Sequence, residues 1–207
     1  MQQARRFDWI TNPGVPAPPK PCNTIVAQTD SFVALPSQGS LVPGWLLVIP
    51  RRPLINLAQL WPRERDELNL FVARLHDRLA VFPGRVFEFE HGARTIGSAT
   101  GCGVDQAHLH VVPLPFNLLQ ACRQTSLQWS YASSRDELPP EFAPDSEYLF
   151  ARERGNSAIC TPVIDPVSQW FRKLIAANLD IADLWDYRAH PFNHAVRKTL
   201  DLIKPAA

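Results

Sequence analysis

The sequence predicts one domain that mixes strands and helices and ends in a helical tail, and three observations support this class. The chain has 207 residues, which is enough to bury one sizeable core. Apolar residues make up 45% and charged residues 20%, as in ordinary globular proteins. Segments of strand-like alternation and of helix-like apolar spacing follow one another along the chain. We therefore expect strand, strand, helix, strand, strand and then helices.

The first predicted elements are a hairpin and a helix. Residues 23–36 alternate, with β-branched and aromatic residues, and the turn signal at 37–40 leads into an apolar run at 45–49. We expect this second strand to be buried on both faces. Residues 62–82 begin with proline and carry apolar residues at spacings of three and four, namely Leu68, Phe71, Val72, Leu75, Leu79 and Phe82. This spacing predicts an amphipathic helix packed on a sheet.

The later elements are separated by proline and glycine. Pro83 and Gly84 end the helix, and the chain then favours strands at 86–90 and 107–112. Helical spacing returns at 166–177 and again at 194–203, whereas residues 116–160 are turn-rich and predict no definite element. Prolines cluster at 13–21, 113–115 and 139–144, so these stretches are expected to be loops or extended connectors.

Charge and cysteine content exclude several classes of protein. Lys and Arg total 21 against 20 for Asp and Glu, so no net field attracts nucleic acid or an anionic membrane, and any bound anion needs a local site. The four cysteines stand far apart without a CxxC pair, which favours reduced thiols in a cytoplasmic protein. No segment has the apolar length of a signal peptide, or the roughly 18 apolar residues of a membrane span. We therefore expect a protein that is neither exported nor inserted in a membrane.

Two histidines on one predicted strand are the strongest chemical signal. In residues 106–113, QAHLHVVP, strand alternation puts Gln106, His108 and His110 on one face and aliphatic side chains on the other. The preceding segment 97–105 is small and rich in glycine, so its backbone N–H groups could cradle an anion. A neutral imidazole can attack phosphorus at neutral pH. On the residues alone, phosphate chemistry and an inert histidine pair at a sheet edge both stay open.

The segment from Gln106 to Pro113 resembles the signature of the histidine triad (HIT) superfamily, with Gln106 in place of the first histidine. The middle histidine of that signature falls on His108 and the third on His110. The chain also resembles the opening hairpin of the family at residues 30–35 and 43–50, including a Val-Ile-Pro turn, and the element order matches over residues 23–115. The resemblance is closest to the longer bacterial HIT-like branch.

The resemblance implies an α+β fold with a HIT-like antiparallel sheet, packed helices and an additional C-terminal helical tail. It implies that His108 attacks the α-phosphate of a nucleotide without a metal or another cofactor, giving a nucleotidyl-His108 intermediate. His110 would then polarise a phosphate oxygen, and the backbone of Gly101, Cys102 and Gly103 would neutralise charge on the phosphoryl group. Many family members carry Ser or Thr where this chain has Gly103. Gln106 can donate and accept hydrogen bonds but cannot relay a proton.

Several other residues could bind a phosphate or a metal, and a simpler interpretation exists for each. His91, in a Glu-His-Gly element similar to one in the longer branch, could donate to a phosphate or leaving group, or could be a turn histidine. A zinc site would combine His91 with Cys102, His108 and His110, but a paired cysteine is missing. Gln169 and Arg172 share a face of the first tail helix, where Arg172 could clamp a distal phosphate or simply face solvent.

The hairpin supplies candidate nucleoside contacts, and the tail supplies aromatic residues. Asp30, Phe32 and Trp45 lie on the hairpin that borders the base and ribose in this family, and Asp30 suits a ribose hydroxyl. We assign nucleoside binding to Asp30 and Phe32. The segment from Trp185 to Arg188 resembles one in the same longer HIT-like proteins, and we interpret its aromatic residues as packing that docks the tail.

We divide the chain into a proline-rich extension (1–22), a HIT-like catalytic core (23–115), and a variable segment with the helical tail packed on the core (116–207). The leading function is a nucleotide hydrolase acting on a nucleotidyl conjugate or dinucleoside polyphosphate. The alternatives are a nucleotidyltransferase or phosphorylase, as in the galactose-1-phosphate uridylyltransferase and diadenosine polyphosphate phosphorylase branches, and a non-catalytic nucleotide or RNA-binding module. The balanced charge argues against RNA. A homodimer is conceivable, although the tail could cover the same surface.

Overall fold

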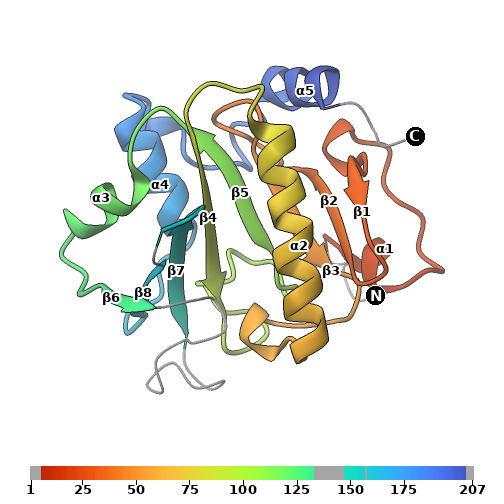
Figure 1. The fold of residues 1–207 in the computed structure, drawn as a ribbon, viewed down its shortest axis with the longest axis horizontal. Helices are drawn as coiled ribbons and strands as arrows, with labels where there is room; N and C mark the ends of the chain where they lie inside the picture. Colours follow the sequence, from red (N-terminus) through yellow and green to blue (C-terminus); the bar gives the residue numbers. More distant parts are fainter. Residues whose placement is uncertain (1–5, 133–146, 157, 204–207) are drawn as a thin grey trace.

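The computed structural model describes residues 6–132, 147–156 and 158–203, and one antiparallel sheet forms its centre (Figure 1). Its strands are β1 (Ala27–Gln28), β2 (Phe32–Pro36), β3 (Leu46–Pro50), β4 (Arg85–Gly92), β5 (Leu109–Leu114), β6 (Ser130–Ala132), β7 (Tyr148–Glu153) and β8 (Ala158–Pro162). They are ordered β1-β2-β3-β5-β4-β7-β8-β6, and every neighbouring pair is antiparallel. The expected α+β fold with an antiparallel sheet is confirmed.

The helices cover both faces of this sheet. They are α1 (Asp8–Thr11), α2 (Pro62–Leu79), α3 (Leu118–Arg123), α4 (Trp170–Asn178) and α5 (Asn193–Leu202), with short 3-10 turns at Pro21–Asn23 (η1), Leu57–Gln59 (η2) and Ala182–Leu184 (η4). Figure 1 shows α2 lying across one face of the sheet and α4 on the other side. The C-terminal helical tail is therefore present as expected. None of the described helices is long and apolar enough to cross a membrane.

The first predicted strand, residues 23–36, was drawn too long. Its first residue, Asn23, is the last of η1, and residues 27–36 fold into the hairpin β1–β2, in which Ala27 pairs with Ala34. The turn between them is held by Glu67 on α2, whose carboxylate accepts from the N–H of Ser31 at 2.9 Å and from its hydroxyl at 2.6 Å. A contact to a residue so distant in sequence cannot be seen in the local pattern.

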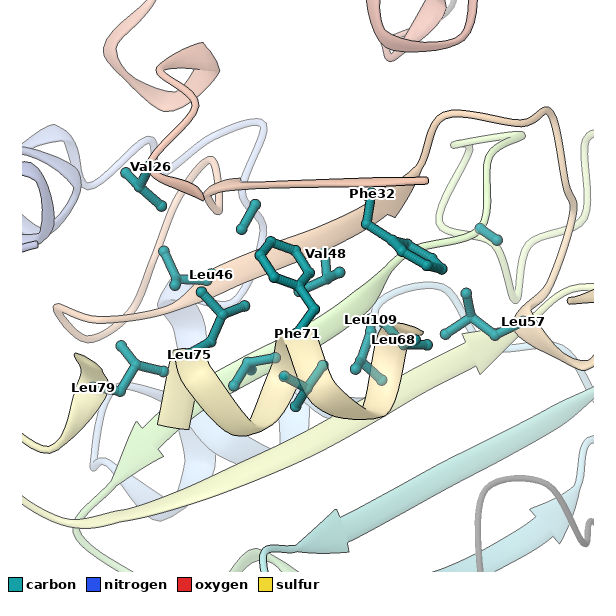
Figure 2. Close-up of a cluster of buried hydrophobic side chains, with 14 of the residues drawn as sticks. Val26, Phe32, Leu46, Val48, Leu57, Leu68, Phe71, Leu75, Leu79 and Leu109 are labelled. Atoms are coloured by element: carbon teal, nitrogen blue, oxygen red, sulfur yellow. The ribbon is translucent and has the colours of Figure 1, made fainter. Parts of the chain in front are cut away.

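The helix α2 buries its apolar stripe against one face of the sheet, as its spacing predicts. Leu68, Phe71 and Leu75 of the helix meet Leu46, Val48 and Leu109 of β3 and β5 (Figure 2). Alternation then turns Trp45, Leu47 and Ile49 to the opposite face, and all five residues of β3 are buried, as expected. The sheet is thus filled on both sides at its centre.

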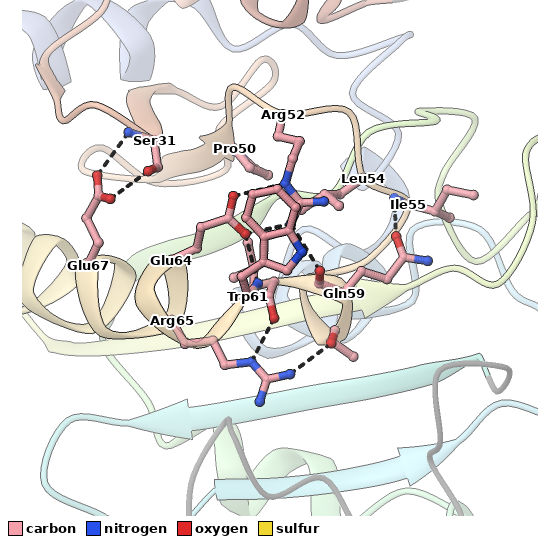
Figure 3. Close-up of polar contacts among 12 residues, drawn as sticks. Ser31, Pro50, Arg52, Leu54, Ile55, Gln59, Trp61, Glu64, Arg65 and Glu67 are labelled. Carbon is pink, nitrogen blue, oxygen red and sulfur yellow. Dashed lines mark hydrogen bonds and ion pairs between the residues drawn. The ribbon is translucent and has the colours of Figure 1, made fainter.

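A polar network fastens the connection between β3 and α2 (Figure 3). Arg52 forms an ion pair with Glu64 and lies over the ring of Trp61, with its guanidinium carbon 4.1 Å from the ring centre. Glu64 also accepts from the N–H of Trp61 at 2.8 Å, which satisfies an unpaired donor at the start of α2. Arg65 donates to the carbonyls of Leu60 and Ala58. Side-chain contacts therefore fix the segment between β3 and α2, and Gln106 bonds to the backbone of this same segment.

The region 116–160, for which the sequence predicted no element, extends the sheet. Strand β7 pairs with β4 so that His91 lies beside Leu149, and β8 and β6 follow at the edge. The proline cluster at 139–144 lies outside the described residues. The predicted strand at 86–90 is longer than expected, because pairing with β7 keeps His91 and Gly92 inside β4.

The two ends of the chain meet the face of the sheet that α2 leaves free. Phe7 and Ile10, next to and within α1, pack on Val33, Leu35, Leu47 and Ile49 of β2 and β3. On the other half of this face, Phe171 and Ile175 of α4 pack on Phe87 and Phe89 of β4. The helix expected at 166–177 starts only at Trp170, because Gln169 adopts the left-handed conformation with φ 59°. The second tail helix lies within one residue of its expected bounds.

Candidate functional site

The pair of histidines lies between these two covered halves. His110 belongs to β5, where it pairs with Leu47 on one side and Phe89 on the other, and His108 immediately precedes the strand. Their ring centres are 5.0 Å apart. The alternation therefore places both rings on one face, as the sequence predicts, and a cavity opens beside them.

Hydrogen bonding leaves one nitrogen of His108 available as a nucleophile. Its Nδ1 lies 2.8 Å from the carbonyl oxygen of Gln106, so Nδ1 must carry the proton in the neutral ring. The lone pair is then on Nε2. Burial lowers the pKa of His108 to about 4, and the positive charge of Arg6 acts in the same direction, although the Gln106 carbonyl opposes them. The ring is therefore neutral at physiological pH, as a nitrogen nucleophile requires.

His110 has the opposite tautomer. The indole N–H of Trp45 donates to its Nδ1 at 2.9 Å, so the proton of the neutral ring must be on Nε2. The ring is stacked on Phe89, with centres 4.4 Å apart and planes 8° apart. Burial, with the neighbouring His108 and His91, keeps its pKa well below the usual value. His110 is thus a neutral N–H donor beside the lone pair of His108.

His91 is a second such donor. Its Nε2 accepts from the backbone N–H of Phe171 at 3.2 Å, which places the proton of the neutral ring on Nδ1. That Nδ1 is buried and has no partner among the described residues. Burial lowers the pKa of His91 to about 3. The residue lies in a strand rather than a turn, 6.0 Å from His110 between ring centres, so the turn interpretation is wrong.

Two guanidinium groups line the same cavity. Arg172 of α4 is buried, donates to the carbonyls of Trp185 and Gly39, and lies 5.0 Å from the ring centre of Trp45. Arg6 enters from the N-terminal segment and donates to Gln38. Arg172 is therefore not on a solvated helix face. The absence of any carboxylate from the cavity wall, among the described residues, makes the site electropositive.

The glycine-rich loop approaches the cavity, but part of its backbone is already engaged. The N–H groups of Cys102 and Val104 donate within the loop, to Ala99 and Gly101. Gly103 has φ +72° and Cys102 φ +58°, so the chain turns sharply here. Cys102 and Val104 border the cavity, whereas Gly101 and Gly103 are not part of its wall, and phosphate binding by their N–H groups stays a prediction.

Gln169 is one of the predicted phosphate ligands, but its side chain is hydrogen-bonded to other residues of the tail. Its amide bridges Asp186 and the N–H of Tyr187, which anchors the tail. Its backbone N–H donates to the sulfur of Cys102 at 3.1 Å. Gln169 and Cys102 both border the cavity, but their polar groups hold the tail against the loop. Gln169 and Cys102 therefore stabilise the packing around the site.

Gln106 also faces away from the histidines. Its amide nitrogen donates to the carbonyls of Pro50 (2.9 Å) and Arg52 (3.0 Å), and its oxygen accepts from the N–H of Leu54 (3.3 Å). Only its backbone carbonyl reaches His108. The carboxamide thus ties the start of β5 to the segment after β3, and no relay through it is present among the described contacts.

The two predicted nucleoside ligands do not reach the cavity. Phe32 is fully buried on the α2 side of the sheet, in the core of Figure 2, so it points away from His108. Asp30 lies exposed in the β1–β2 turn and is not part of the cavity wall. Strand alternation turns Val33 and Leu35, rather than Phe32, to the face of the sheet on which the cavity lies.

The cavity itself is small. It is bounded by the histidines and both arginines, by Phe7 and Tyr187 from the covering segments, and by Leu47 of β3 and Val104 of the glycine-rich loop, and it holds about 40 Å³. One water molecule takes roughly 30 Å³ in the liquid, whereas ligand pockets begin near 300 Å³. Entry of a nucleotide therefore requires the covering residues to move. Phe7, whose ring centre is 5.9 Å from that of His108, is the most direct obstacle.

Sequence reasoning missed three residues of this site. Trp45 was noted only for its place on the hairpin, yet its indole sets the tautomer of His110. Arg6 and Phe7 precede the first proline cluster in a segment treated as an extension, although the apolar residues of 7–10 offered a signal of packing. Among the described residues, no group of three or more His, Cys, Asp or Glu is placed to hold a metal ion, so the zinc interpretation gains no support.

Comparisons with known proteins give a match to a family model and several structural likenesses. The sequence model of the HIT domain matches residues 20–116. A HIT-like protein involved in cell-cycle regulation from Bartonella henselae is 18% identical over 53% of this chain and 78% of its own, with a TM-score of 0.42. A histidine triad protein from Clostridium difficile is 20% identical over 55% and 93%, with a TM-score of 0.37. A hypothetical histidine triad nucleotide-binding protein from Sulfolobus tokodaii is 20% identical over 43% and 58%, with a TM-score of 0.34. None of the curated proteins compared with the chain matches it.

Proposed function

Since residues 20–116 form a HIT domain, we propose that the protein is a nucleotide hydrolase that cleaves at the α-phosphate through a covalent nucleotidyl-His108 intermediate. The proposal rests on the tautomers of the three histidines that line the cavity. One free lone pair, on His108, lies among two imidazole N–H donors and two guanidinium groups. Such a set suits attack on a phosphorus atom whose oxygens carry negative charge.

In the first step, Nε2 of His108 forms a bond to the α-phosphorus. The bond from phosphorus to the bridging oxygen breaks, and the leaving group departs with that electron pair. His108 keeps its Nδ1 proton, so the ring bears a positive charge, which the carbonyl of Gln106 stabilises at 2.8 Å. His110 donates to an oxygen of the phosphoryl group. No proton needs to leave the nucleophile, because the lone pair is already free.

In the second step, water attacks the same phosphorus and the N–P bond breaks. The electron pair returns to Nε2, the ring becomes neutral, and the water leaves its oxygen on the nucleoside monophosphate and releases one proton to solvent. The closed cavity has room for about one water molecule beside His108.

The proposal is tested by turnover on a panel of nucleoside phosphoramidates and dinucleoside polyphosphates. His108→Asn keeps a polar side chain but lacks the ring nucleophile, and we expect a loss of several orders of magnitude. His194→Asn, at an exposed position of α5, is the matched control and should behave as wild type. A loss below about tenfold in His108→Asn on a substrate that the wild type cleaves would overturn the mechanism.

A further inference from the structure

We infer that the C-terminal tail, through Arg172 and the N-terminal end of α4, completes this site and makes it select nucleotides that carry a second negatively charged phosphate. The inference rests on the proposed function and names its substrate class. The tail residues involved lie beyond residue 116, where the match to the HIT domain ends. They are therefore additions of this chain to the matched domain.

The environment of Arg172 points to an anionic ligand. Its side chain is 4% exposed, and its guanidinium meets two backbone carbonyls and the rings of Trp45 and Tyr187. No carboxylate forms an ion pair with it among the described residues. The carboxylate of Asp186 acts on Arg172 only through space, because it accepts from Gln169 and from the N–H of Arg188. A buried cation without an ion-pair partner is costly to fold, and an anionic ligand would supply that partner.

The tail also prepares His91 for such a ligand. The N–H of Phe171, at the start of α4, occupies Nε2 of His91 and leaves a buried Nδ1–H without a partner. His91 and Arg172 both line the cavity, one from the sheet and the other from the helix above it. His91 thus supplies an N–H donor, and Arg172 a positive charge, on the same side of His108.

The two halves of the cavity differ in chemistry, which sets the direction of the substrate. Toward β2 and β3, the wall is formed by Phe7 and Leu47, which pack with Val33, Leu35 and Ile49, and Arg6 also lines this side beside the ring of Phe7. Toward β4, the wall carries His91 and Arg172. A nucleoside fits the first half, and the phosphate of the leaving group fits the second. Arg172 would thus contact the β-phosphate, while His108 attacks the α-phosphate.

The tail is held in place by the turn that precedes β3. Gly39 has φ +66°, its N–H donates to the carbonyl of Pro191 at 3.1 Å, and its own carbonyl accepts from Arg172. A β-carbon at Gly39 would come within 2.7 Å of Tyr187. The position of Arg172 thus follows from close packing between tail and turn.

The test compares the affinities for a nucleoside monophosphate and the matching diphosphate, measured by titration calorimetry for each of the four common bases. For the base that binds best, wild-type protein should prefer the diphosphate by about 10- to 100-fold, the worth of a charge-assisted hydrogen bond. In Arg172→Met the preference should fall below about threefold, whereas Arg172→Lys should keep part of it. Arg197→Met, at an exposed position of α5, is the control and should match wild type.

The outcomes separate this inference from the proposed function. A wild type without preference for the diphosphate, or an Arg172→Met variant that keeps the full preference, overturns the role of the tail. If Arg172→Met only loosened the tail, both affinities would fall together and their ratio would stay, which also overturns it. Each titration, including that of the protein with the native Arg172, is carried out in the His108→Asn background, so that the diphosphate is not cleaved and the ratio of affinities does not depend on a covalent intermediate.

Discussion

Replacing Gln106 by leucine removes three hydrogen bonds at the point where β5 begins. The carboxamide donates to the carbonyls of Pro50 and Arg52 and accepts from the N–H of Leu54. Pro50 and Leu54 are buried, while Arg52 is partly open to water, so two backbone groups would be left without a partner. An unpaired buried group costs about 1–3 kcal/mol, so for two groups we expect Gln106→Leu to lower the free energy of unfolding by about 2–6 kcal/mol.

The same reasoning predicts a smaller direct effect on chemistry. His108 takes its hydrogen bond from the backbone carbonyl of residue 106, which the substitution retains. Gln106→His, which restores the family signature, should also lower stability, because a neutral imidazole offers one donor and one acceptor where the carboxamide uses two donors and one acceptor. We expect no gain of activity from this variant, because the side chain at position 106 bonds to the backbone of residues 50–54 and only its backbone carbonyl bonds to His108.

Urea unfolding, followed by tryptophan fluorescence, measures the stability, and kcat/KM at a temperature where each variant is folded measures the chemistry. Gln120→Leu, at an exposed position of α3, is the control and should change stability by less than about 0.5 kcal/mol. Gln106→Leu with wild-type stability and a large loss of kcat/KM would refute the reasoning, because the carboxamide would then act on the reaction rather than on the fold.

Three further predictions follow from the tautomers and charges of the site. Trp45→Phe removes the donor that fixes His110, and kcat should fall about tenfold as the ring samples the wrong tautomer, with the loss read from single-turnover rates. Burial lowers the pKa of His108 to about 4 and that of His91 to about 3, whereas in the unfolded chain a histidine has a pKa near 6.5. The unfolded state therefore binds more protons below pH 6.5, and the free energy of unfolding, measured with urea, should fall as the pH drops from 6.5 toward 4. No change over this window would contradict the burial of neutral rings. Chelators should leave activity intact, since histidine and backbone donors take the place of a metal; loss of activity with loss of bound zinc would favour the zinc site.

The central strand and the first helix could be predicted from the sequence because their signals are local. Alternation in residues 106–112 is enough to put His108 and His110 on one face, and apolar spacing in α2 is enough to bury Leu68 and Leu75. The face to which Phe32 turns could not be settled in the same way. It depends on the exact end of the β1–β2 turn, and a shift of one residue exchanges the two faces of a strand.

The rest of the site depends on contacts between distant segments. His91 stays in a strand only because β7, some 58 residues later, pairs beside it, as the bond from Tyr148 to Glu90 at 2.7 Å also shows. Arg172 reaches the cavity through the turn at Gly39, and Phe7 through packing on β2 and β3. None of these partners leaves a periodic mark in the sequence, so the family resemblance located the histidines but not the residues that enclose them.

The most direct test of the account is a search for the covalent intermediate. Wild-type protein is mixed with a dinucleoside polyphosphate, quenched within one turnover under alkaline conditions that preserve a phosphoramidate, and analysed by peptide mass spectrometry. The account predicts one added nucleoside monophosphate on the peptide that contains His108, fragmenting at that residue, and none in His108→Asn. An adduct on His91 or His110 instead, or steady cleavage without any adduct at the shortest times, would contradict it.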